Sequence, residues 1–93
     1  MKKVEINRKD FIWGEDFYTV LKKQFNFPDW FGNNVDALWD MLTGFVETPC
    51  EITFIGFGCK ENEYNGYIIK SILSCFNDVA KKYPTKYKII YKK

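Results

Sequence analysis

The sequence predicts an α/β fold in which three helices pack on a small parallel sheet of three strands. Short apolar or alternating segments near both ends and in the middle of the chain have the pattern of strands, and helical spacing fills the stretches between them. Helical connections between strands favour parallel pairing, because a parallel pair needs a long crossover. We expect the order β-α-α-β-α-β in a single domain of 93 residues.

The first strand and the first helix are marked by alternation and by charge. Residues 3–7 alternate polar and apolar side chains, as a short strand does. Helix signals begin at Gly14, where Glu15 and Asp16 suit the positive end of the helix dipole. Pro28 then ends this helix.

A second, shorter helix is expected to follow a loop. Either Asn33 or Asn34 can cap its start, and Gly44 ends it. Asp36 and Asp40 then lie one turn apart on the face that points away from the core. The apolar positions at helical spacing, which we expect to face the core, are Val35, Leu38, Trp39 and Leu42.

The second half of the chain predicts a strand, a helix and a last strand. Residues 50–57 are mostly apolar and are expected to form a buried strand. Residues 56–66 are polar and contain the turn signal Asn65-Gly66, so we expect a loop there. A third helix is expected from about Tyr67 to Lys82, followed by a strand at 87–91.

The composition limits the chemistry of the chain. It contains no histidine, which removes the usual general base and the commonest metal ligand. The three cysteines, Cys50, Cys59 and Cys75, are odd in number and form no Cys-x-x-Cys pair. We therefore expect reduced thiols rather than a disulfide framework or a zinc site, and neither a metal nor a cofactor.

Hydropathy gives an expectation about location. No apolar run approaches the roughly 20 residues that span a bilayer. Residues 1–7 also lack the apolar stretch of a secretory signal. We expect a cytoplasmic protein that does not bind a membrane.

Acidic and basic residues are unevenly distributed along the chain, although the net charge is only +2. Residues 24–59 contain five acidic side chains and no lysine or arginine, which gives −5. The rest of the chain holds all 14 basic residues against 7 acidic ones, which gives +7. An acidic middle favours a site for a cationic partner, because like charges raise the local concentration of an opposite charge.

Aromatic side chains flank the two aspartates of the second helix. Trp30 and Phe31 precede the helix in a polar loop, and Phe45 follows it. Rigid rings supply contact area, and carboxylates accept the forked donors of arginine. The combination of these rings with Asp36 and Asp40 indicates a protein-binding surface.

The segment from Pro28 to Glu47, PDWFGNNVDALWDMLTGFVE, resembles the barstar family of intracellular ribonuclease inhibitors. The expected element order agrees with the barstar-like fold, and the resemblance extends over nearly the whole chain. After Pro28, the residues that carry it are Gly32, Asn34, Asp36 to Asp40, Leu42 to Gly44 and Glu47.

The resemblance implies a stoichiometric inhibitor that covers the cationic active site of a secreted, barnase-type ribonuclease. Asp40 matches the central acid of the family, Asp36 a neighbouring acid, and Asp78 on the third helix an interface acid. Lys82 falls where a second acid is expected, which suggests a different cognate enzyme. The other matching partner-binding positions are Trp30, Phe31, Asn34, Val35, Trp39, Thr43, Gly44 and Phe45.

Three other functions fit parts of the sequence. The fold could bind a different cationic protein. Asp36 and Asp40 could hold a divalent ion or act as an acid–base pair, although no third ligand is evident. The lysine-rich residues 81–93, with their tyrosines, could bind RNA. We expect a monomer that is not an enzyme and that acts on its partner without binding nucleic acid directly.

Overall fold

The structure is a computed structural model that describes residues 1–58 and 60–93. Its order of strands and α-helices is the predicted β-α-α-β-α-β. The elements are β1 (Lys2–Asn7), a 3-10 helix η1 (Arg8–Asp10), α1 (Asp16–Phe25), α2 (Val35–Gly44), β2 (Cys50–Ile55), α3 (Glu63–Lys82) and β3 (Tyr87–Lys92).

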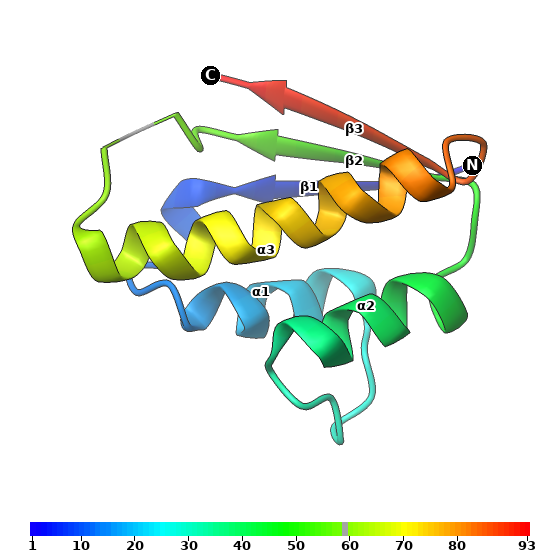
Figure 1. Ribbon diagram of the computed structural model, residues 1–93, viewed down its shortest axis with the longest axis horizontal. Coiled ribbons are helices and arrows are strands. Elements are labelled where there is room, and N and C mark those ends of the chain that lie inside the picture. The colour runs from blue at the N-terminus through cyan, green and yellow to red at the C-terminus, as the bar shows by residue number, and fades with distance from the viewer. Residues whose placement is uncertain (59) are drawn as a thin grey trace.

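The three strands form one parallel sheet in the order β1-β2-β3, as predicted. Val4, Ile52 and Ile89 lie side by side in its register. The three α-helices cover one face of the sheet (Figure 1). Helix α1 contacts β1, α3 contacts β3, and α2 packs against α3. Helix α2 therefore forms the outer part of the helical layer.

No helix within residues 1–58 and 60–93 covers the other face of the sheet (Figure 1). Lys3, Glu51 and Lys88 form one row across it. The Nζ atoms of Lys3 and Lys88 lie 4.0 and 3.9 Å from the carboxylate of Glu51. A row of alternating charge keeps this face polar, as is usual for a sheet face in contact with water.

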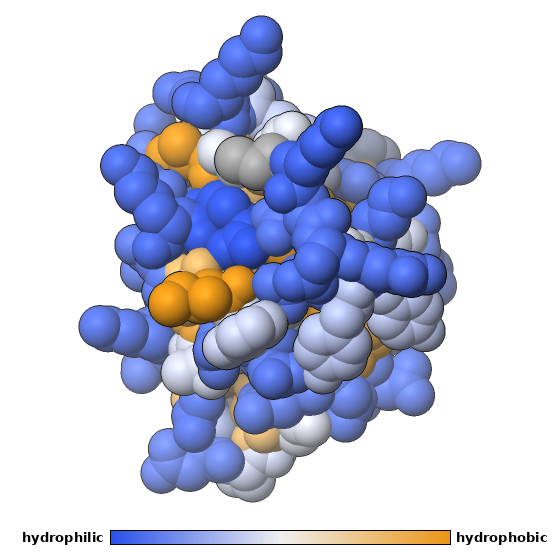
Figure 2. Space-filling model, turned by 90° about the vertical axis from the view of Figure 1, so that its left-hand side faces the viewer, coloured by the Kyte–Doolittle hydropathy of each residue, from blue (hydrophilic) through white to orange (hydrophobic). Residues whose placement is uncertain are grey.

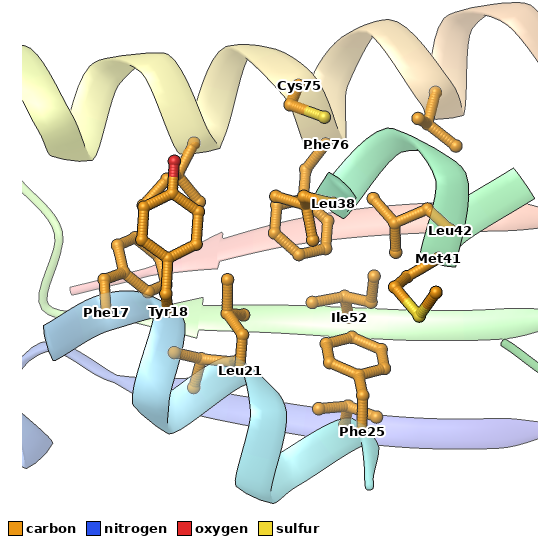
Figure 3. Packing of buried hydrophobic residues seen from close by; sticks show 14 of the residues in the cluster. Phe17, Tyr18, Leu21, Phe25, Leu38, Met41, Leu42, Ile52, Cys75 and Phe76 are labelled. Atoms are coloured by element: carbon orange, nitrogen blue, oxygen red, sulfur yellow. The ribbon is translucent and has the colours of Figure 1, made fainter. Parts of the chain in front are cut away.

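The core lies between the sheet and the helices, and phenylalanine is its most frequent residue. Figure 3 shows aromatic and aliphatic side chains packed together there. Phe54, on the central strand, is 0% exposed. Its ring centroid lies 5.1 Å from that of Phe76 on α3, 5.6 Å from that of Tyr91 on β3 and 6.4 Å from that of Phe17 on α1. This one side chain therefore joins three elements.

Helix α3 begins earlier than predicted. The side chain of Asn62 accepts a hydrogen bond from the backbone N–H of Asn65 at 2.8 Å, so Asn62 caps the helix. Asn65 and Gly66 consequently lie in the first turns of α3, and the turn predicted there is wrong. The Asn65 amide is buried and holds the chain before α1, since it accepts from Gly14 N and donates to Ile12 O.

Other boundaries differ from the predictions by a few residues. The first helix begins at Asp16 rather than Gly14, and the second strand ends at Ile55 rather than Phe57. Gly56 has a φ of +81°, which takes the chain out of the extended conformation.

Two of the three cysteines can be described. Cys50 and Cys75 are buried free thiols, and Cys59 lies outside the described residues. None of the helices in the described part of the chain is both long enough and apolar enough to cross a membrane.

A half-buried ion pair ties the end of β1 to the segment before α3. Arg8 Nε lies 2.6 Å from Glu61 Oε2, and Arg8 Nη2 lies 2.7 Å from Oε1. The guanidinium also donates to Phe11 O and lies over the Phe11 ring. The hydrogen bond from Arg8 lowers the pKa of Glu61 below its usual value.

This pair predicts a specific dependence of stability on pH. Because the folded pKa of Glu61 is lowered, its contribution is present above the unfolded pKa of about 4.3 and is lost as pH falls through the folded pKa. We expect the difference in free energy of unfolding between wild type and Glu61→Gln to shrink below about pH 4.3. Urea titrations from pH 7 to pH 3 measure it, with Glu63→Gln on the exposed side of α3 as the control. A difference that stays constant over this range would contradict the prediction.

Candidate partner-binding surface

The exposed side of α2 carries two carboxylates. Asp36 and Asp40 are both exposed and lie one turn apart, as predicted. Among the ion pairs within residues 1–58 and 60–93, none includes either aspartate. We call the face formed by Asp36, Asp40 and the neighbouring Asp78 of α3 the acidic surface.

Asp78 joins this surface from the adjacent helix. The buried thiol of Cys75 lies 3.9 Å from the carbonyl oxygen of Val35, at the contact between α2 and α3. Burial, together with the nearby carboxylates of Asp78 and Asp36, raises the pKa of Cys75 to about 11. Asp36 on α2 and Asp78 on α3 are therefore both near this buried thiol.

The loop before α2 turns one of its two aromatic residues outward and the other inward. Trp30 is 73% exposed, whereas Phe31 is 6% exposed and its ring centroid lies 4.8 Å from that of Phe27. A hydrogen bond from Phe31 N to Pro28 O fixes the turn between them. The expectation that the Phe31 ring lies on the surface is wrong, because the ring fills the space between Phe27 and Tyr18. The Phe31 ring therefore anchors the loop to the core.

Asn34, rather than Asn33, caps α2. Its Oδ1 atom accepts a hydrogen bond from Ala37 N at 2.8 Å, and its Nδ2 atom donates to Gly32 O at 3.0 Å. A Cβ atom at Gly32 would lie 3.1 Å from this Nδ2 atom, which is closer than most such contacts. Asn33 instead adopts a positive φ of 49°, as asparagine tolerates. The cap fixes the direction in which α2 presents its aspartates.

The end of α2 carries the remaining predicted contact residues. The Thr43 hydroxyl donates to Trp39 O at 2.8 Å. Gly44 is exposed, and a Cβ atom there would meet nothing within 4 Å. Phe45 is 48% exposed and packs edge-on against Phe27. An exposed ring therefore precedes the helix in the chain and another follows it, Trp30 and Phe45.

The comparison with known proteins agrees with this arrangement. Residues 1–92 match the family described as barstar (barnase inhibitor). The chain belongs to the barstar family. A curated relative named "Putative ribonuclease inhibitor YrdF", from Bacillus subtilis (strain 168), is 33% identical to it over 90 residues. The alignment covers 97% of this chain and 98% of that relative. The predicted family and the barstar-like fold are confirmed.

This barstar-family chain places some predicted residues only partly on the surface. Val35 and Trp39 are half-buried and pack against the core while their outer parts border Asp36 and Asp40. Met41 of the same helix is buried, although the apolar spacing of the sequence did not single it out.

Lys82 approaches the acidic surface from α3. Its Nζ atom lies 5.6 Å from the centroid of the Trp39 ring, within the range of a cation–π contact. The same atom lies 5.6 Å from the Tyr83 ring, which Lys86 also approaches. Lys82 therefore adds a positive charge to the border of the acidic surface, next to Trp39.

The lysine-rich end of the chain does not form a continuous row of exposed rings. Tyr87 is 4% exposed, and its hydroxyl donates to Leu42 O. One side of the Tyr91 ring stacks on Phe54, although the residue is 50% exposed. Because bases stack on exposed rings, this arrangement gives the RNA-binding alternative little support.

Proposed function

We propose that this barstar-family protein inhibits a secreted, barnase-type ribonuclease by forming a stoichiometric complex that covers the enzyme's active site. The main support is the acidic surface, whose aspartates on α2 are exposed and have no ion pair among the described residues. The family assignment and the relative's printed name support the same function.

The proposed mechanism of inhibition is the pairing of carboxylates on this protein with cationic side chains in the active site of the enzyme. A ribonuclease that binds the RNA backbone needs arginine and lysine side chains in its active site, since phosphates are anionic. Asp36 and Asp40 project in the same direction from a capped helix, so they are held in place before the partner arrives. Each carboxylate can accept two parallel hydrogen bonds from one guanidinium. Asp40 in this proposal enters the centre of the cationic site, and Asp36 and Asp78 contact its margin.

The exposed rings exclude water from this contact. Trp30 precedes α2 in the chain and Phe45 follows it, and both rings are exposed. Desolvation strengthens the attraction between carboxylates and cations only when both are fully paired. An enzyme surface that packs on the two rings would give Asp40 this environment. Asn34, Val35, Trp39, Thr43 and Gly44 supply the remaining contact area.

The proposed partner determines where the inhibitor should act and the molar ratio of the complex. An inhibitor of a secreted nuclease protects the producing cell when it acts before export, so we place the protein in the cytoplasm. It acts as a monomer, one molecule per enzyme, and needs no cofactor because occupation of the site by carboxylates is sufficient.

The experiment is a titration of a secreted barnase-type ribonuclease with this protein at a fixed concentration of fluorogenic RNA. We expect activity to fall linearly and to reach its floor near a molar ratio of one. The equivalence point should not move when the RNA concentration is doubled. A protein that acts by sequestering RNA would instead require more material as RNA increases. Full activity at a tenfold molar excess, across a set of such enzymes, would refute the proposal.

A further inference from the structure

A cleft of about 430 Å³ lies beside the acidic surface. It is bounded by the start of α1, by the residues that precede α2 and by the first half of α3. Asn34 and Val35 form one of its borders, so it continues directly from the turn that leads to Asp36. Figure 2 shows the end of the molecule at which α1 and α3 begin: it is mostly hydrophilic, with side chains of intermediate hydropathy gathered in its lower half.

Tyr18 brings a hydroxyl group to the wall of this cleft. Tyr18 is 8% exposed, and its hydroxyl makes no hydrogen bond with the described residues. The hydroxyl points toward α3 (Figure 3). Within the described part of the chain, no side-chain polar atom is both sealed from solvent and unpaired, so this hydroxyl must open into the cleft. At this position the hydroxyl can exchange water for a hydrogen bond from a group that enters the cleft.

The rest of the lining favours a cation. Glu15 is the one charged residue among those described that line the cleft. Its Oε2 atom accepts a hydrogen bond from the Tyr64 hydroxyl, and this contact raises the pKa of Tyr64. The rings of Tyr64 and Tyr67 are 57% and 74% exposed, so their faces are accessible. The cleft thus combines a carboxylate, a hydroxyl and two electron-rich rings.

We propose that this cleft receives an arginine side chain of the ribonuclease, next to the active site that the acidic surface covers. This inference rests on the proposed function. A guanidinium can donate to the Glu15 carboxylate and to the Tyr18 hydroxyl oxygen at once, because its donors diverge in one plane. The same plane can stack on the Tyr67 ring. A lysine ammonium fits less well, since it is a compact group that cannot stack.

The first test compares variants of the cleft that leave the fold intact. Tyr18→Phe removes the hydroxyl and keeps the ring, and Glu15→Gln removes the charge and keeps the shape. Each is expected to weaken binding to a ribonuclease that the wild type inhibits by about tenfold, as for a lost charge-assisted hydrogen bond. Ile12→Ala is the control, because Ile12 is 73% exposed and does not line the cleft. Its dissociation constant should match that of the wild type.

A double-mutant cycle then identifies the occupant. Each surface arginine and lysine of the enzyme is replaced by alanine and measured against both wild type and Glu15→Gln. We expect one arginine whose loss removes the effect of Glu15→Gln. Unchanged binding of Glu15→Gln and Tyr18→Phe, or coupling to a lysine, would overturn the arginine subsite while leaving the proposed function intact. If the wild type itself inhibits no enzyme of the set, both proposals fail.

Discussion

Replacement of Asp40 by alanine is expected to weaken ribonuclease binding by about 2 to 5 kcal/mol, a loss of roughly 30-fold to several thousand-fold in affinity. In the proposed complex this carboxylate lies in the centre of a cationic site that water has left. Its removal leaves the arginine and lysine side chains of the enzyme buried without a partner, which costs more than the loss of one attraction. The measurement is the dissociation constant from inhibition at several protein concentrations.

Two further variants make this result specific. Asp40→Asn keeps the shape of the side chain and removes its charge, so it should lose most of the same affinity. Asp10→Ala removes an exposed carboxylate from η1, outside the acidic surface, and should bind almost as the wild type does. The role of Asp40 is wrong if the alanine variant inhibits the enzyme as well as the wild type does.

Replacement of Phe54 by alanine is expected to cost about 3 to 5 kcal/mol of folding stability. Phe54 is fully buried on the central strand, and its ring contacts those of Phe17, Phe76 and Tyr91. The substitution would leave a cavity where the sheet and two helices meet. A domain of this size has a total stability of about 5 to 14 kcal/mol, so the loss is a large part of the whole. Urea denaturation followed by tryptophan fluorescence measures it.

Trp30→Ala is the matched control, because it also removes a large ring. Trp30 is 73% exposed, so its loss should change the free energy of unfolding by less than about 0.5 kcal/mol. The same variant should weaken ribonuclease binding, which separates contact from folding. Equal destabilisation by Trp30→Ala and Phe54→Ala would mean that the core does not depend on Phe54 as described.

Local patterns were sufficient to predict the fold wherever they agreed with distant contacts. The apolar spacing of α2, with Leu38 and Leu42 inward, matches the burial that is observed. The start of α3 was missed because Asn65-Gly66 is a turn signal when only its neighbours are considered. Its amide is bound instead to Ile12 O and Gly14 N, more than 50 positions earlier in the chain. Long-range hydrogen bonds of this kind leave no mark on local sequence.

The sequence predicted the positions of the aspartates on the acidic surface more fully than those of the aromatic rings around them. Two aspartates at i and i+4 on an amphipathic helix must project on one side, so Asp36 and Asp40 followed from periodicity. Neighbouring rings give no such rule: Trp30 and Phe31 are adjacent, and Phe31 is the one that packs inward against Phe27 and Tyr18. The tyrosine-lined cleft draws on three separate elements, so no single segment of the sequence could reveal it.

The parallel arrangement of the strands has a practical consequence for assays. Strand β3 ends at the carboxyl edge of the sheet, where Lys93 lies beside Gly56 and Phe57. Helix α2 ends at the opposite edge and leads into the first residue of β2 (Figure 1). A biotin or dye attached at position 93 therefore emerges at the edge of the sheet opposite the end of α2. Immobilisation through this residue leaves the helix that carries the aspartates open to an enzyme in solution.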